Sequence, residues 1–262
     1  MTTARFTRWI PAFALILAAG AANLAGALAG EAHLYLAPYG FDSKFTGDGQ
    51  ISGGNVGSDF DLEDTFDIDP KETVRGVDGF LKFAGSRIDF GYNHGDYTGA
   101  ETLKSALVFN GVTYGAGEHV HSEFDLTHYR LMYGYDFSLR VVNVGFLVGG
   151  HVVDVDARVK SSAAGHEQEE LRAPVPVVGV TLGIHPISQI AIHAQISGMS
   201  VTISNVKARL IDGFVGVHYL PIPKFGIVAG YRYFVFDGED KDENDRADIK
   251  QRGPYAGIAL HL

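Results

Sequence analysis

The last eight residues of the chain alternate between apolar and mixed side chains. From position 256 onward, the even positions are apolar and run through Ile258 and Leu260 to the final residue, Leu262. The odd positions, beginning with Tyr255 and Gly257, are mixed. A period of two places successive side chains on opposite faces of a strand. The pattern therefore predicts a strand with one apolar face that continues to the end of the chain.

The amino end of the chain has the composition of a secretory signal peptide. Arg5 and Arg8 precede an apolar, alanine-rich run, and Ala27 and Ala29 then form a small-x-small cleavage site. A transmembrane anchor is the alternative, but proline, glycine and asparagine interrupt the run. We therefore expect residues 1–29 to be a cleaved signal peptide and residues 30–262 to be one exported domain.

The remaining sequence excludes several classes of protein. No apolar run after residue 30 approaches the ~20 residues that a membrane-spanning helix needs. Without Arg5 and Arg8, the formal net charge of −10 becomes −12, which disfavours nucleic acid as a partner. The absence of cysteine excludes disulfides and thiolate metal sites. An exported chain with 33 glycines and 12 tyrosines fits a β-rich protein with many turns.

Tight and long connections alternate along the chain. Tight connections are expected around 85–86, 137–140, 185–188 and 221–224, and long polar ones at 46–72, 98–120, 160–170 and 238–247. Short turns at one end and long loops at the other are typical of a transmembrane barrel. We therefore predict an all-β fold: a closed antiparallel up-and-down transmembrane β-barrel of ten strands, with eight or twelve as alternatives. Its last strand would pair with a first strand at 33–39.

The chain end also carries a family resemblance. The spacing of Tyr255, Gly257, Leu260 and Leu262 resembles the C-terminal assembly signal of bacterial outer-membrane β-barrels, although Phe is the usual last residue there. The mature chain is similar to small outer-membrane proteins of the OmpA and OmpW types. The resemblance implies a multi-pass location in the outer membrane of a Gram-negative cell envelope. It also implies contact with outer-membrane lipids and lipopolysaccharide, and with barrel-assembly machinery and periplasmic chaperones during biogenesis.

The hairpin around Gly85-Ser86 predicts a specific register. If paired positions sum to 171, Lys82 faces Asp89 and Phe80 faces Gly91, and the other face is wholly apolar. A one-residue slip would scramble both faces at once. The hairpin is therefore strong local support for the barrel.

Charged residues recur on the predicted inward faces. These candidate lumen residues are Asp78, Lys82, Arg87, Asp89, Arg130, Asp212 and Arg232. One interpretation is that Lys82–Asp89 and Asp212–Arg232 are interior ion pairs that neutralise each other. The other is that the arginines line a constriction for small solutes. Glycines on the same faces would make room either for long side chains or for a narrow path.

Eight tyrosines near predicted strand ends or on outward faces would form aromatic girdles at the two membrane interfaces. They are Tyr92, Tyr97, Tyr129, Tyr133, Tyr135, Tyr219, Tyr231 and Tyr233.

No catalytic or metal constellation stands out. His94-Gly95-Asp96 and Asp154-Val155-Asp156 are superficially like the rim of outer-membrane proteases of the omptin kind, but their parity follows the lipid-facing residues. Four histidines at 119, 121, 128 and 151 are a weak metal signal. The acidic stretches 59–69 and 237–248 are expected to be solvated loops. We therefore expect no cofactor, no metal and no enzymatic activity.

The functional expectation follows from these points. The chain is predicted to be a non-enzymatic outer-membrane barrel with a narrow or plugged lumen, serving envelope structure or surface interaction. A porin-like narrow pore for passive passage of small solutes is the first alternative. An omptin-like rim protease is the second.

Overall fold

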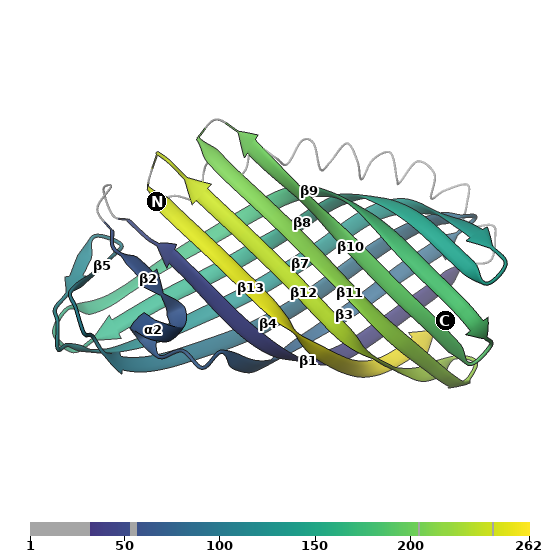
Figure 1. Cartoon of the computed structure of the whole chain (residues 1–262), viewed down its shortest axis with the longest axis horizontal. Helices are drawn as coiled ribbons and strands as arrows, with labels where there is room; N and C mark the ends of the chain where they lie inside the picture. The colour runs from purple at the N-terminus through teal and green to yellow at the C-terminus, as the bar shows by residue number, and fades with distance from the viewer. Residues whose placement is uncertain (1–31, 53–56, 204, 243) are drawn as a thin grey trace.

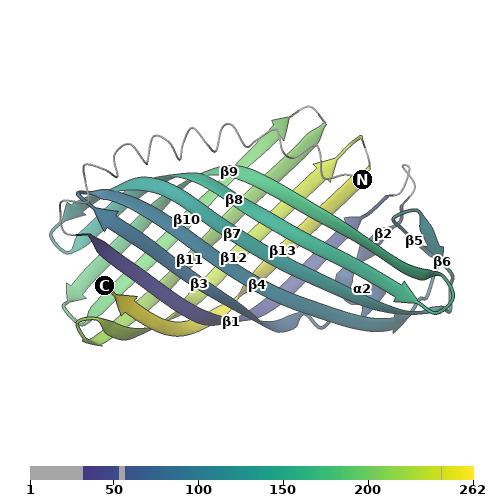
Figure 2. The same cartoon turned by 180° about the vertical axis from the view of Figure 1, so that it is seen from behind.

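The computed structural model describes residues 32–52, 57–203, 205–242 and 244–262. Ten long antiparallel strands form one closed barrel, which confirms the predicted fold class and strand number (Figures 1 and 2). They are β1 (His33–Gln50), β3 (Lys71–Phe83), β4 (Ser86–Thr102), β7 (His119–Leu139), β8 (Val142–Ser161), β9 (Gly165–Ile187), β10 (Ile190–Ile203), β11 (Val206–Ile222), β12 (Phe225–Asp240) and β13 (Asp245–His261). The predicted signal peptide lies outside the described residues. Among them, no helix has the length and apolarity that crossing a membrane requires.

The barrel closes where the terminal strand meets the first strand. β13 pairs with β1, with Gly257 opposite Tyr39, and Leu34 and Leu262 exchange two backbone hydrogen bonds of 2.8 Å. The predicted pairing of the last strand with residues 33–39 is thus confirmed. Closure leaves no unpaired edge at this seam, where such an edge would be costly in lipid.

Strands on one end of the barrel, here named the turn end, are joined by the predicted tight turns. The first of them is formed by Ala84 and Gly85, both with positive φ (48° and 83°), as a two-residue type I′ hairpin requires. The pairs therefore sum to 169, so Lys82 lies opposite Arg87 and Phe80 opposite Asp89. The predicted register of 171 is wrong by two residues. Because two residues are one full side-chain period, the assignment of faces was correct.

The other end, here named the loop end, holds less loop than predicted. The expected loop 160–170 is largely strand, since β8 and β9 continue to a three-residue turn at 162–164. The prediction ended these strands where apolar alternation stops, but the backbone ladder continues through alternating polar residues.

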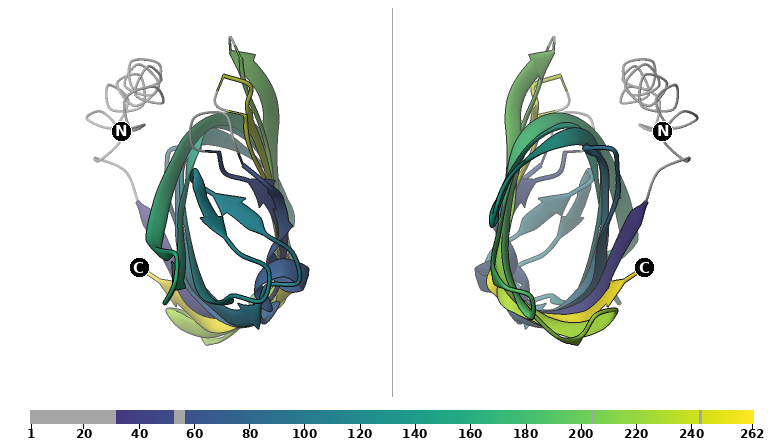
Figure 3. Two further views of the ribbon diagram at one scale, coloured as in Figure 1. Left: turned by 90° about the vertical axis from the view of Figure 1, so that its left-hand side faces the viewer. Right: turned by 90° about the vertical axis from the view of Figure 1, so that its right-hand side faces the viewer.

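Three short elements fold over the loop end: β2 (Asp59–Asp61), α2 (Leu62–Phe66) and the separate hairpin of β5 (Leu107–Phe109) and β6 (Val112–Tyr114) (Figure 3). Asp61 caps α2 by accepting 2.8 Å hydrogen bonds from the N–H groups of Glu63 and Asp64. The predicted solvated acidic loop is therefore partly wrong, because apolar residues interleaved with the acids are buried beneath it. These residues are Phe60, Leu62, Phe66 and Ile68.

Exposed apolar side chains form a band around the turn-end half of the barrel. It includes Phe146, Val178, Ile196, Val215, Ile227 and Ile258. Exposed tyrosines accompany the band at Tyr92, Tyr129, Tyr135, Tyr219, Tyr231 and Tyr233, as predicted for aromatic girdles, whereas Tyr133 is half-buried. Tyr97 is the exception, because it is buried inside and stacks on Phe45 at 4.0 Å.

The two faces of the strands exchange character about halfway along the barrel. On β7, Arg130 is buried inside while Tyr129 is exposed outside. Four to six residues nearer the loop end, Leu126 and Phe124 are buried inside while Asp125 lies on the outer face. The turn-end half thus has a polar interior and an apolar exterior, and the loop-end half has the reverse.

Candidate functional site

Four charged side chains cross the lumen in the turn-end half and are named here the arginine layer: Asp78, Arg130, Asp212 and Arg232. They come from β3, β7, β11 and β12 and are all buried. Arg130 donates from Nη2 to Asp78 at 2.7 Å and from Nη1 to Asp212 at 2.9 Å. Arg232 pairs with Asp78, and its Nη2 lies 3.8 Å from Asp212. Two positive and two negative charges are therefore matched across the barrel axis.

The remaining predicted lumen residues form a second ionic group near the turn end. Arg87 pairs with Asp89 two residues along the same strand, and its Nη1 lies 3.7 Å from Asp136. Lys82 pairs with Asp136 rather than with Asp89, so the predicted Lys82–Asp89 pair does not form. Asp136 was missed because the predicted register placed Lys82 opposite Asp89.

Aromatic rings fill the space between these charges. The Arg87 guanidinium lies 4.1 Å from the centre of the Phe80 ring, and that of Arg232 lies 4.8 Å from the Tyr39 ring. Such cation–π contacts stabilise buried guanidinium groups. A Cβ on the inward glycine Gly216 would overlap the hydroxyl of Tyr255, so that glycine makes room for the tyrosine.

Little empty volume remains in this region. A cavity beside the arginine layer, lined by Asp78 and Arg130 of that layer and by Phe80, His193 and His218 among others, measures about 10 Å³. A cavity needs roughly 10–15 Å³ to hold one water molecule. The glycines of the inner face therefore accommodate long side chains, and the described side chains leave no wide path through this part of the lumen.

Histidines close the lumen next to the arginine layer. His128 and His151 share a 2.7 Å hydrogen bond, and with Asp212 they place three candidate metal-ligand atoms within 4.8 Å of one another. Asp212 already accepts from Arg130, and His151 also lies 3.3 Å from the Ser197 hydroxyl. The two histidines therefore bond to each other and Asp212 to Arg130, so the three groups already have other partners. His119 and His121 are exposed elsewhere, so the four predicted histidines do not converge.

A larger cavity of about 420 Å³ occupies the loop-end half and is named here the loop-end cavity. Phe124, Leu126, Phe236 and Ile249 are among its apolar walls, and Leu62 of α2 also lines it. Sequence reasoning missed this site because it assigned outward positions to apolar residues throughout. The signal was present, since Phe124 and Leu126 keep the parity of the inward residue Arg130.

The candidate protease residues lie on the outer wall. His94 Nε2 is 2.6 Å from Asp96 Oδ1 on β4, whereas Asp154 on β8 pairs with Arg172 at 3.6 Å. β7 lies between these strands, and Asp96 is exposed. The two groups therefore neither face the lumen nor meet across a common substrate position.

Charged residues on the outer wall of the loop-end half form their own network. Arg158 contacts Asp156 at 2.7 Å, Asp125 at 3.2 Å and Glu123 at 3.3 Å. Partial burial raises the pKa of Asp125, and the Arg158 guanidinium opposes that shift. Such a charged outer wall belongs in water, so this half projects beyond the lipid.

Glu118 joins two connections at the loop end. Its carboxylate accepts from the N–H of Gly115 at 2.7 Å, from the N–H of Ala164 at 3.0 Å and from the Ser161 hydroxyl. The Ser161 hydroxyl and the Gly115 N–H favour the charged carboxylate, so they hold its pKa below the ordinary value of 4.5.

This contact predicts a pH effect on the loop end. A lowered folded-state pKa gives stabilisation that is complete above pH 4.5 and is lost as the pH falls through the lower, folded-state pKa. The amide proton signals of Gly115 and Ala164 should therefore move upfield as the pH is lowered below 4.5 in NMR spectra of the refolded barrel. Glu118→Gln should abolish that titration. The amide of Gly117, which donates to Leu103, serves as the control; an equal shift there would contradict the assignment.

Comparisons with known proteins bear on the fold. No protein-family model matches the chain, and no curated protein matches it in sequence. Among solved structures, the chain is similar to the outer membrane protease OmpT of Escherichia coli at 7% identity and a TM-score of 0.55, covering 88% of this chain and 97% of that one. The translocator domain of the autotransporter NalP from Neisseria meningitidis matches at 11% identity and a TM-score of 0.39, covering 88% of each chain. Ail of Yersinia pestis matches at 12% identity and a TM-score of 0.34, covering 88% of this chain and 99% of that one.

The likeness to OmpT shows a shared fold, and at 7% identity it transfers no activity. The fold is that of bacterial outer-membrane β-barrels, as the terminal strand predicted. Together with the apolar outer band, it confirms the expected multi-pass location in the outer membrane.

Proposed function

We propose that this chain is a non-enzymatic outer-membrane barrel with a sealed lumen, which serves envelope structure and surface interaction through its loop-end half. The observation that supports it is the arginine layer with its matched charges, beside which the cavity between Asp78, Arg130 and the packed rings measures only about 10 Å³. Charges buried in a membrane protein often mark a pathway for ions. Here, however, the carboxylates of Asp78 and Asp212 form ion pairs with the guanidinium groups of Arg130 and Arg232.

The proposal extends to the partners of the barrel. The apolar band would contact outer-membrane lipids, and the charged outer wall of the loop-end half would lie beside lipopolysaccharide. The terminal strand would present Tyr255, Gly257, Leu260 and Leu262 to the barrel-assembly machinery, after periplasmic chaperones have delivered the chain.

Planar-bilayer recording tests the sealed lumen. The native protein should give no steady single-channel openings, because side chains fill the arginine layer. The double variant Arg130→Ala/Arg232→Ala removes two long side chains and should introduce openings. Steady openings in the native protein would instead favour the narrow pore. In that case Arg232→Ala should change their ion selectivity, since Arg232 would line the constriction.

The absence of catalysis needs its own assay. The refolded barrel should turn over neither peptides nor acylated lipids, because His94 and Asp154 lie apart on the outer wall. Turnover that is lost in His94→Ala would overturn the non-enzymatic proposal and restore the rim-protease alternative.

A further inference from the structure

The barrel wall is incomplete between β9 and β10 in the loop-end half. The two strands pair from Ile187–Ile190 only as far as Val178–Gly198. Beyond that pair, β9 continues to Gly165 alongside β8, while β10 turns away with β11 (Figure 3). The segment 165–177 of β9 therefore pairs with β8 on one side but forms no strand pairing with β10 on the other.

Two prolines account for this interruption. Pro174 and Pro176 lie just past the last pair, and both remain opposite residues of β8. Proline has no N–H to donate, so within sheets it is confined to positions that need no ladder bond on that side. The sequence Pro174-Val175-Pro176 thus ends the pairing with β10 and fixes the place of the gap.

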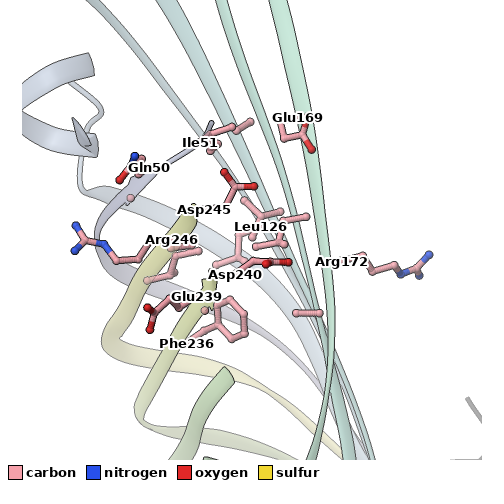
Figure 4. Close-up of a pocket in the computed structure, with 18 of the residues that line it drawn as sticks. Gln50, Ile51, Leu126, Glu169, Arg172, Phe236, Glu239, Asp240, Asp245 and Arg246 are labelled. Carbon is pink, nitrogen blue, oxygen red and sulfur yellow. The ribbon is translucent and has the colours of Figure 1, made fainter. Parts of the chain in front are cut away.

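The loop-end cavity reaches this gap. Its walls include the inward residues Leu171 and Ala173 of β9, but also their outward neighbours Arg172 and Pro174. Figure 4 shows Arg172 directed away from the side chains that point into the cavity. On the far side of the gap the wall is supplied by Val206–Ala208 of β11. No residue of β10 whose side chain is described lines the cavity. The cavity therefore passes through the barrel wall where β10 is missing.

The gap begins within the lipid-facing band. Val178 of the last pair and Ile196, two residues before its partner Gly198, are 52% and 54% exposed, and Met199 just beyond the pair is 36% exposed. Val178 and Ile196 belong to the outer band, whereas Met199 lies on the inward face opposite the buried Leu210, so its exposure arises at the gap. The end of the gap nearer the turn end therefore borders the outer leaflet. An apolar molecule could then enter from the lipid without crossing the sealed lumen.

The chemistry of the cavity selects the ligand. Its volume of about 420 Å³ lies within the ~300–1,000 Å³ of ordinary small-molecule sites, and Phe124, Leu126 and Phe236 give it apolar walls. Of the ten charged residues described along its rim, seven are acidic. Two of the three basic ones are paired, Arg172 with Asp154 and Arg246 with Asp48, and among the acidic ones Asp125 is also paired, with Arg158. Acidic groups therefore still outnumber basic ones along the rim. An anionic head would meet net repulsion there, and a cationic head would meet attraction.

We propose that the loop-end cavity binds an amphiphile with one hydrocarbon chain and a cationic head, which enters sideways from the outer leaflet between β9 and β10. The chain lies among the apolar walls and the head remains at the acidic rim. This site is separate from the arginine layer, so it does not depend on whether the lumen conducts.

Photolabelling tests the site. The barrel in lipid nanodiscs is exposed to dodecylamine that carries a diazirine in mid-chain, and labelled residues are mapped by mass spectrometry. Saturable labelling is expected on residues 124–126 and 236–249, with the matching dodecanoate competing at least tenfold more weakly than dodecylamine. Ala173→Phe, which fills the cavity, should reduce labelling at least tenfold, whereas Leu182→Phe, on the outer face of the same strand and away from the gap, should leave it unchanged. Labelling confined to the lipid-facing band, or unaffected by Ala173→Phe, would overturn the proposal.

A covalent cross-link between β9 and β10 tests whether the amphiphile enters through the gap. The chain has no cysteine, so the pair Val177→Cys/Met199→Cys can be introduced without competing thiols. Residues 177 and 199 would be the next partners if the β9–β10 ladder continued. Oxidation of the pair, or bridging with a short bis-maleimide where the thiols lie too far apart, should slow labelling from the bilayer at least fivefold compared with the unlinked protein. An unchanged rate would place the entrance at the loop end and overturn the lateral route.

Discussion

Replacing Asp78 by asparagine is expected to lower the free energy of unfolding of the barrel by about 3–5 kcal/mol, the usual cost of breaking a buried ion pair. Asp78 is the carboxylate shared by Arg130, at 2.7 Å, and Arg232. Without its charge, two buried guanidinium groups face Asp212 alone. The measurement is urea unfolding in phosphatidylcholine vesicles, followed by circular dichroism.

The control for this prediction is an exposed ion pair on the same barrel. Asp48 and Arg246 lie 3.4 Å apart at the loop end with about half of each side chain exposed, so Asp48→Asn should cost less than about 1 kcal/mol. Adding Arg232→Gln to Asp78→Asn should recover part of the loss, because it removes one unmatched charge. If Asp78→Asn cost no more than Asp48→Asn, water would have to reach the arginine layer, and the sealed lumen would be wrong.

Replacing Gly253 by alanine is expected to destabilise the closing seam by about 1–3 kcal/mol, the usual cost of overpacking. Gly253 lies on β13, and a Cβ there would overlap the backbone carbonyl oxygen of Asp42 on β1. The two strands would have to move apart at the pairing that closes the barrel. Heat modifiability on SDS gels should show a lower fraction of folded barrel and a lower temperature at which the folded band is lost.

Gly183 provides the matched control for Gly253. It is also a strand glycine, on β9, but a Cβ there would meet nothing closer than 3.6 Å. Gly183→Ala should therefore leave the heat transition nearly unchanged. Equal effects at both glycines would show that backbone propensity, rather than close approach at the seam, determines the result.

Much of the barrel could be predicted from local sequence. Turn chemistry located the tight connection at Gly85, which adopts positive φ, and terminal alternation identified the strand that closes the barrel. Alternation alone could not fix the register of the β3–β4 hairpin, since a shift of two residues leaves every side chain on the same face. The partner of Lys82 therefore depended on the turn residues Ala84 and Gly85.

The loop-end half was harder to predict for a different reason. Its inward residues, such as Leu126, are apolar, as in a protein surrounded by water. The inward residues of the turn-end half, such as Arg130, are polar, as in a barrel surrounded by lipid. If apolar residues are assumed to point outward along the whole chain, Tyr97 is assigned to a girdle and β8 and β9 are predicted to end too early. The sequence of β7 does show this change. Between Asp125 and Tyr129, the outward positions change from charged to apolar while the inward positions change from apolar to polar.

The exchange of faces along each strand also determines how deeply the protein sits. On the outer face of β7, charged Asp125 is followed after Thr127 by Tyr129 and Leu131, so the boundary is only two side-chain periods wide. Each period spans about 6.6 Å along the strand. Sinking by that amount would bring charges toward hydrocarbon, and rising would expose apolar surface to water. This sharp boundary on the outer face should therefore fix the position of the protein along the membrane normal, even where the thickness of the bilayer varies.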